Sequence, residues 1–168
     1  RAIELTRLDT SATLQVADIG CGTGASTLVL ANKLRNAQIT AVDLFPEFLD
    51  ILTERASVAG CSKRIETLVG SMDSLPFSNE SLDLIWSEGA IYNIGFAKGI
   101  ESWRPILRTD GVIAVSEITW LRPDPPEEIR QHWSNEYPEI ATASEKISIL
   151  ERGGYDLIGY LVLPSTNW

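Results

Sequence analysis

The stretch VADIGCGTGAS, residues 16–26, decides the fold class of this protein. Three glycines, Gly20, Gly22 and Gly24, alternate behind a short apolar run that carries one acid, Asp18. Glycine lets a chain turn sharply and lets a ligand come close to the backbone. Because a tight turn alone needs only one glycine, the spacing predicts a strand that ends in a ligand-binding loop and continues into a helix.

The composition limits the kinds of partner. The 168 residues suffice for one domain with a single core, and 44% hydrophobic with 22% charged residues is typical of a globular protein. The 23 acids exceed the 14 bases, which gives a formal net charge of −9. This balance argues against nucleic acid and against an anionic membrane surface, because both attract clustered Lys and Arg. It is compatible with a cationic ligand.

The two cysteines and the single histidine bear on whether the protein has disulfides or a metal site. Cys21 and Cys61 lack a metal-type spacing, so we expect no disulfide framework and take the reducing cytoplasm as the default location. His132 is the single histidine, which argues against a histidine-based metal site. No apolar run approaches the roughly 20 residues that a membrane span needs. A homodimer stays open.

Strand-like apolar runs alternate with helix-period segments along nearly the whole chain. We expect strands over 14–19, 37–44, 64–70, 82–89, 111–120 and 155–164. We expect helices over 25–36, 46–60, 95–107, 126–137 and 142–154. Pro105 should bend the third helix, and Thr142 with Glu145 forms a capping box for the last. This order predicts a three-layer α/β domain with a doubly wound, mostly parallel, Rossmann-like sheet that binds ligands at the carboxyl ends of its strands.

The second expected strand ends at Asp43, 19 residues after Gly24. An acid about 20 residues after such glycines is where a nucleotide fold holds the ribose hydroxyls, and a carboxylate can accept from both. The alternatives are a solvated loop acid, or a charge that favours the start of the helix at Pro46.

Polar side chains also follow the other strands. At Ser71, Met72 and Asp73 a carboxylate could accept from an exocyclic amine while a thioether packs on a flat ring; the alternative is a local turn. The polar segment 87–93 ends the fourth strand and is not explained by packing. Because a buried carboxylate needs a partner, Glu117 in the fifth strand belongs either to the cleft or to a structural ion pair.

The glycine spacing separates two cofactor classes. Dinucleotide enzymes favour Gly-x-Gly-x-x-Gly around a pyrophosphate, whereas this chain has Gly-x-Gly-x-Gly with Asp18 two residues ahead. Asp18 would repel a pyrophosphate but could help to hold a cationic amine. S-adenosylmethionine has no phosphate, carries an ammonium group and has both ribose hydroxyls free. The motif therefore favours S-adenosylmethionine.

At these motifs the chain resembles the class I S-adenosylmethionine-dependent methyltransferases. VADIGCGTG is similar to their first motif, AVDLF to the acidic strand end, GSMDSLPF to the adenine-contacting motif and LDLIWSEGAIYNIG to the fourth motif. LRTDGVIAVSE resembles the segment that enters the fifth strand, so the resemblance extends over about residues 12–120. Within the class, IWSEGAIYNIGF and AVSEITW resemble a bacterial and archaeal small-molecule group related to quinone-biosynthesis C-methyltransferases.

The resemblance implies roles for the strand ends. The glycines would line the methionine moiety with Asp18 near its ammonium group, while Asp43 would hold the ribose and Leu44 would pack on adenine. Met72 and Asp73 would contact the adenine edge. The predicted cofactor-binding residues are Asp18, Gly20, Cys21, Gly22, Gly24, Asp43, Leu44, Ser71, Met72, Asp73 and Ser87.

The chain departs from the family at its two ends. The family sheet usually closes with a seventh, antiparallel strand, for which nothing remains after LVLPSTNW. The N-terminal segment that often caps the substrate is short, and the chain opens at Arg1 within what reads as the tail of a helix. We therefore expect residues 1–168 to be a single-domain fragment with an intact cofactor cleft.

Methyl transfer is an in-line displacement at a carbon that the sulfonium already activates, so alignment and exclusion of water are the main tasks of the protein. The resemblance places Ser87 or Glu88 near the sulfonium. A base is needed only if the nucleophile arrives protonated, and the predicted catalytic residues are Glu88, Tyr92 and Glu117.

Aromatic residues and the single histidine are weaker candidates. Trp120, Trp133 and Tyr137 could form an apolar substrate wall, although aromatic residues at helical spacing are by default part of a core. His132, beside Trp133, is more typical of a surface or packing position.

Three functions remain in view. The leading hypothesis is a methyltransferase that acts on a small molecule. A non-catalytic subunit that binds S-adenosylmethionine is the alternative. An NAD(P)-dependent oxidoreductase is less well supported, because the glycine spacing differs and no catalytic Tyr-x-x-x-Lys pairing occurs.

Overall fold

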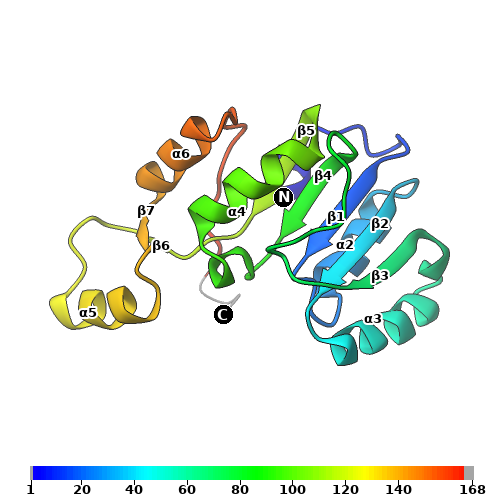
Figure 1. Ribbon diagram of the computed structural model, residues 1–168, viewed down its shortest axis with the longest axis horizontal. Helices are drawn as coiled ribbons and strands as arrows, with labels where there is room; N and C mark the ends of the chain where they lie inside the picture. The colour runs from blue at the N-terminus through cyan, green and yellow to red at the C-terminus, as the bar shows by residue number, and fades with distance from the viewer. Residues whose placement is uncertain (1, 165–168) are drawn as a thin grey trace.

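A computed structural model describes residues 2–164 of the chain. Its centre is a five-stranded sheet in the order β3-β2-β1-β4-β5, and every pair of neighbouring strands is parallel (Figure 1). The strands are β1 (Gln15–Ile19), β2 (Gln38–Asp43), β3 (Ile65–Val69), β4 (Leu82–Ser87) and β5 (Leu107–Val115). The order reverses direction between β1 and β4, as the prediction of a doubly wound α/β sheet requires.

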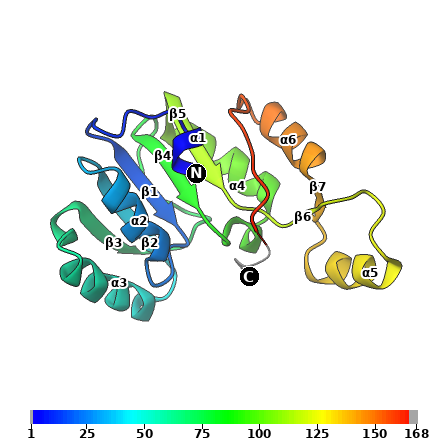
Figure 2. The same ribbon diagram turned by 180° about the vertical axis from the view of Figure 1, so that it is seen from behind.

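Helices cover both faces of the sheet. One face packs against α1 (Ala2–Leu5), α2 (Ala25–Lys33) and α3 (Pro46–Val58), and the other against α4 (Phe96–Trp103), on which α6 (Ala143–Arg152) packs in turn. Helix α4 lies in front of the sheet in Figure 1, and α2 lies in front of it in the reverse view of Figure 2. Successive residues of β1 serve opposite layers, since Val16 belongs to the first core and Ala17 to the second. The three-layer prediction is confirmed.

Local sequence signals explain several element boundaries. Pro46 occupies the first turn of α3, and Gly60 follows the helix at a φ of 70°. Pro105 ends α4, because the chain passes from Trp103 into the short 3-10 turn η3 (Arg104–Ile106) and then into β5. The helix expected over 95–107 is therefore shorter than predicted, and β5 begins four residues earlier than predicted.

The region between β5 and α6 forms a small unit beside the sheet. The expected fifth strand divides into β5 and the two-residue β6 (Thr119–Trp120), which pairs in parallel with β7 (Ala141–Thr142). Between them, α5 (Glu127–Glu136) stands away from the sheet and has no buried residue (Figures 1 and 2). The chain returns to the interior at Tyr137, which is buried.

The strand predicted over 155–164 is wrong. These residues form no strand, and the segment instead runs in extended form past α1, where Gly159 comes close to Leu5 (Figure 2). The apolar pattern is that of a strand, but a strand exists only where a neighbouring edge accepts its hydrogen bonds. No described helix is both long and apolar enough to cross a membrane.

Candidate cofactor and acceptor site

The glycine loop connects β1 to α2 at the carboxyl end of the sheet. Gly20, Gly22 and Gly24 have φ values of 72°, 54° and 84°, a region that favours glycine. A Cβ atom on Gly20 would lie 2.3 Å from the Ala90 side chain, and one on Gly24 would lie 2.1 Å from Leu52. Nothing lies within 4 Å of a Cβ placed on Gly22. Two of the glycines therefore also make room for side chains of the protein itself.

Asp43, at the end of β2, holds the glycine loop. Its Oδ2 accepts a hydrogen bond from the Gly22 N–H at 2.7 Å, and its Oδ1 accepts one from the Phe45 N–H at 3.1 Å. The Gly20 and Cys21 N–H groups both donate to the Val42 carbonyl, at 2.8 and 3.0 Å. The acid and the glycines that the sequence pairs across 19 residues are thus in direct contact.

Asp18 lies beneath the loop and is only 1% exposed. Its Oδ2 accepts a hydrogen bond of 2.6 Å from the hydroxyl of Thr27 in α2. Burial raises the pKa of Asp18 to about 7; the charges of Glu88 and Asp43 act in the same direction, and the bond from Thr27 opposes them. Thr27 was not predicted, although a hydroxyl residue one turn after the glycines is a detectable signal.

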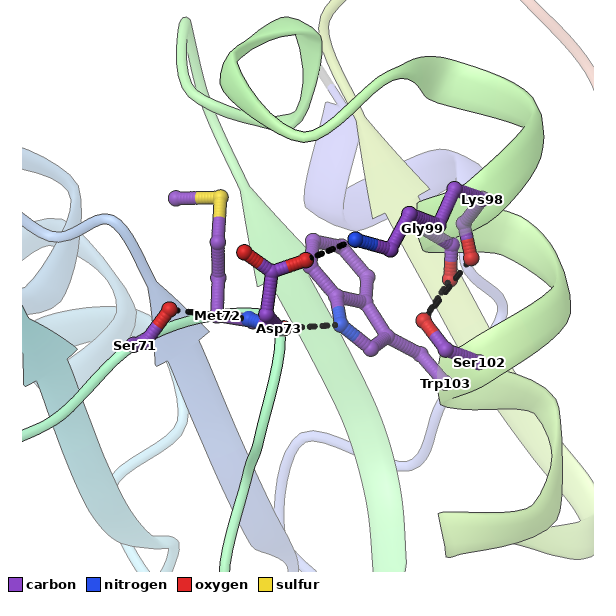
Figure 3. A network of polar contacts seen from close by, with 7 residues as sticks. All are labelled: Ser71, Met72, Asp73, Lys98, Gly99, Ser102 and Trp103. Atoms are coloured by element: carbon purple, nitrogen blue, oxygen red, sulfur yellow. Dashed lines mark hydrogen bonds and ion pairs between the residues drawn. The ribbon is translucent and has the colours of Figure 1, made fainter.

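The loop after β3 is tied to α4 (Figure 3). The Trp103 Nε1–H donates to the Met72 carbonyl at 3.0 Å, and Lys98 forms an ion pair with Asp73. The Asp73 N–H donates to the Ser71 hydroxyl at 3.2 Å, so the loop also contains a local turn. The methyl end of the Met72 side chain lies 3.3 Å from the position that a Cβ on Gly20 would take, which places it beside the glycine loop.

The last residue of β4 is buried, and the loop that follows the strand contributes two exposed residues. The Ser87 hydroxyl is fully buried and donates to the Ile19 carbonyl at 2.9 Å, so it joins β4 to β1. Glu88 is exposed, and its Oε2 accepts from the Ser26 hydroxyl at 2.7 Å and from the Trp86 Nε1–H at 3.4 Å. Tyr92 is 38% exposed.

The carboxylate after β5 is part of a buried cluster. Glu117 Oε1 accepts a hydrogen bond of 2.6 Å from the Tyr137 hydroxyl and lies 2.7 Å from Lys146 Nζ. The Glu117 and Lys146 side chains are 6% and 4% exposed. Burial and the bond to Glu117 raise the pKa of the Tyr137 hydroxyl. Glu117 therefore forms an ion pair, which was one of its two predicted roles. Its partner, Lys146, was missed by sequence reasoning.

The two sides of the site meet between β4 and β5. The Gly89 N–H donates to the Ser116 hydroxyl at 2.7 Å, and the rings of Tyr92 and Tyr137 make an edge contact at 6.1 Å between centroids. His132 and Trp133 lie on α5, outside the interior, where their rings contact each other at 5.6 Å. Within residues 2–164, no three His, Cys, Asp or Glu side chains are arranged to hold a metal ion.

Two further predicted residues lie just beyond the carboxyl ends of β1 and β2. Leu44 directly follows β2 and is largely exposed. Cys21 is buried with a free thiol, and its burial raises the pKa of that thiol.

The similarity to known proteins covers the residues that form the glycine loop and the strand ends. A family model described as a methyltransferase domain matches residues 16–111. Erythromycin 3''-O-methyltransferase of Saccharopolyspora erythraea is 30% identical over 131 residues, covering 76% of this chain and 40% of that protein. Malonyl-[acyl-carrier protein] O-methyltransferase of Dechloromonas aromatica is 32% identical over 101 residues, covering 60% of this chain and 35% of that protein. The chain thus spans less than half the length of these relatives.

Solved structures share the fold. An S-adenosylmethionine-dependent methyltransferase from Geobacter sulfurreducens, in complex with S-adenosyl-L-homocysteine, superposes with a TM-score of 0.76 at 24% identity and covers 91% of this chain and 61% of that chain. The [4+2]-cyclase SpnF superposes with a TM-score of 0.75 at 22% identity, covering 91% of this chain and 54% of that chain.

The parallel sheet, the glycine loop held by Asp43 and the match over residues 16–111 define one class of protein. The chain belongs to the methyltransferase domain family, as a class I S-adenosylmethionine-dependent methyltransferase domain. The resemblance drawn from its motifs is confirmed at the level of this class.

Proposed function

We propose that this protein transfers a methyl group from S-adenosylmethionine to a small-molecule acceptor. The observation that carries the proposal is the hydrogen bond between Asp43 and the Gly22 N–H, which assembles the two parts of the predicted cofactor site. The relatives named above methylate small molecules or an acyl group on its carrier protein, according to their names.

The charges around the glycine loop fit this cofactor. Asp18, Asp43 and Glu88 carry acidic groups near one another, since the charges of the last two raise the pKa of the first. No Lys or Arg occurs within residues 16–26, but the Arg55 guanidinium of α3 donates to a backbone carbonyl of the loop at 2.8 Å. The three acids outnumber this one cation, so a pyrophosphate is disfavoured there, whereas the ammonium and sulfonium groups of S-adenosylmethionine are attracted.

Each part of the cofactor has proposed partners in the chain. Asp18, the three glycines and Cys21 lie along the methionine moiety, and Asp43 takes the ribose hydroxyls. Leu44 and the loop after β3 hold adenine, with Asp73 at its amine. The residues of that loop in the proposed site are Ser71, Met72 and Asp73, and Ser87 supports the site from β4.

The cofactor supplies an electrophilic methyl group. The chain's contribution is to align the acceptor with it and to exclude water. We assign this role to Glu88 beside the loop, to Tyr92 and to Glu117. Glu88 is held in place by the Ser26 hydroxyl, which comes from the first turn of α2.

The acceptor belongs, in our proposal, to the compounds handled by quinone-biosynthesis-type enzymes. A supporting relative is 2-methyl-6-phytyl-1,4-hydroquinone methyltransferase 2 of Oryza sativa, 30% identical over 100 residues, 59% of this chain and 28% of that protein. We also infer a cytoplasmic location, because both cysteines are free thiols.

Calorimetry with the full-length protein tests the cofactor class. We expect binding of S-adenosylmethionine and S-adenosylhomocysteine and no binding of NAD. Binding of NAD alone would overturn the proposal. A screen with tritiated-methyl S-adenosylmethionine and a cell metabolite extract then tests the reaction.

A non-catalytic subunit that binds S-adenosylmethionine is the second candidate. The fold is shared with a protein described as a [4+2]-cyclase, so the fold alone does not determine the reaction. Cofactor binding with no labelled product would support the non-catalytic subunit.

A further inference from the structure

A buried acid–lysine cluster borders the acceptor side of the site. It consists of Glu117, Tyr137 and Lys146, which come from the chain after β5, the end of α5 and the middle of α6. Both polar partners of the carboxylate bind the same oxygen, Oε1. The other oxygen, Oε2, is buried and has no hydrogen-bond partner among the described residues.

Glu117 Oε2 can still accept a hydrogen bond, so the cluster lacks a donor. Lys146 Nζ already lies 2.7 Å from Glu117 and 3.1 Å from the Tyr137 hydroxyl, and it lies 4.7 Å from the centre of the Phe96 ring. Lys146 also compensates the charge of the carboxylate. A buried acceptor atom without a donor costs about 1–3 kcal/mol, so a ligand with an N–H or O–H group gains by binding to Oε2. An anionic ligand group would be repelled.

The position of the cluster suits the methyl acceptor. The Tyr137 ring contacts Tyr92 in the loop after β4, and Ser116, next to Glu117, binds the Gly89 N–H of the same loop. Helix α5 has no buried residue, and Tyr137 is the point at which its end enters the interior. Because Oε2 is buried, the acceptor can reach it only when the packing around the cluster opens.

We propose that Glu117 Oε2 binds an N–H or O–H group of the methyl acceptor, and that Lys146 and Tyr137 are positioning residues that orient this carboxylate. The acceptor is thus an amine, alcohol or phenol rather than a compound with an anionic group at this point. This inference rests on the proposed function. The competing explanation is that the ion pair only fastens α5 and α6 to the sheet.

Two variants separate these explanations. Glu117→Gln keeps the shape but places an amide N–H where the free oxygen lies, when the amide oxygen faces Lys146. The double variant Glu117→Leu with Lys146→Met replaces the pair with apolar groups, a change that is often neutral or stabilising for a merely structural ion pair. Arg108→Met is the matched control, because it breaks the Arg108–Asp83 ion pair at the opposite end of β5.

The experiment measures labelled product formed by full-length protein from tritiated-methyl S-adenosylmethionine over a dilution series of the metabolite extract. Binding of S-adenosylhomocysteine and the melting temperature are measured in parallel. For both Glu117 variants we expect the half-saturating extract concentration to rise about tenfold or more, equivalent to about 1.4 kcal/mol. Binding of S-adenosylhomocysteine should stay unchanged, and the control should behave as wild type.

The outcomes distinguish a failure of this inference from a failure of the proposed function. If wild type forms product and the folded double variant forms it at the same half-saturating concentration, the inference is overturned while the proposed function stands. A wild-type product whose acceptor lacks any N–H or O–H group also overturns it. If wild type forms no labelled product, the proposed function fails and the inference fails with it.

Discussion

Asp43 binds backbone N–H groups with both of its carboxylate oxygens. In Asp43→Asn the amide nitrogen would face one of these N–H groups, leaving it without an acceptor. We expect a loss of about 1–3 kcal/mol in unfolding free energy and weaker binding of S-adenosylmethionine, by about tenfold or more. Calorimetry and urea unfolding measure the two effects. Asp50→Asn, on the exposed side of α3, is the matched control, and unchanged affinity in Asp43→Asn would remove Asp43 from the site.

Asp18 makes the stability of the protein depend on pH. Because its pKa is raised to about 7 in the folded state, the folded protein keeps a proton that the unfolded chain loses from about pH 4 upward. The contribution of Asp18 is therefore complete below about pH 4 and is lost as pH rises through 7, at up to about 1.4 kcal/mol per pH unit.

We predict that Asp18→Asn flattens this fall in unfolding free energy. Urea unfolding of wild type and variant between pH 4 and pH 8 measures the difference, with the other acids common to both proteins. Parallel curves for the two proteins would show that Asp18 does not titrate in this range.

At the scale of elements, α6 depends on its capping box. The Thr142 N–H donates to Glu145 at 2.8 Å, and the Glu145 N–H donates to the Thr142 hydroxyl at 3.4 Å. We expect Thr142→Ala to lower the unfolding free energy by about 0.5–2 kcal/mol, since the Glu145 N–H loses its side-chain acceptor. Ser148→Ala is the control, because that hydroxyl bonds only to the carbonyl of Ser144 within the helix. Equal stabilities of the two variants in thermal unfolding would contradict the role of the cap.

Helix α4 positions the loop after β3. We expect Trp103→Phe to cost about 1–3 kcal/mol, because the Met72 carbonyl loses its donor, and also to weaken binding of S-adenosylhomocysteine. Trp133→Phe on α5 is the matched control. Calorimetry checks the prediction, which fails if only stability changes and affinity does not.

At the scale of the whole molecule, the segment 155–164 leaves several large apolar side chains exposed. The segment 155–164 exposes Leu157, Ile158, Tyr160, Leu161 and Val162, and it pairs with no strand in the described chain. Large contiguous apolar patches favour association. We expect the 168-residue chain to associate with rising concentration in sedimentation velocity, and Tyr160→Lys with Val162→Lys to reduce this association. Val58→Lys, an exposed apolar residue on α3, should not, and a wild-type monomer at all concentrations would refute the prediction.

The residues at the strand ends could be predicted because each signal is local. Asp43 follows its strand directly, and the glycines occupy backbone conformations that other residues avoid. The sequence did not reveal the second reason for glycine at positions 20 and 24. Ala90 and Leu52, from distant parts of the chain, leave no room there for a Cβ atom. Lys146 reads as an ordinary helix-surface lysine, and only packing against Phe96, Tyr137 and Glu117 buries it.

Alternation of strands and helices, the position of the glycine loop and the acid after β2 are properties of neighbouring residues, so the sequence alone determines them. The strand order, the burial of the Glu117–Lys146 pair and the failure of 155–164 to join the sheet depend on contacts between residues far apart in the chain. A run of apolar residues can favour an extended backbone. A hydrogen-bonded strand also needs a free sheet edge to pair with, and that edge exists only in the folded molecule.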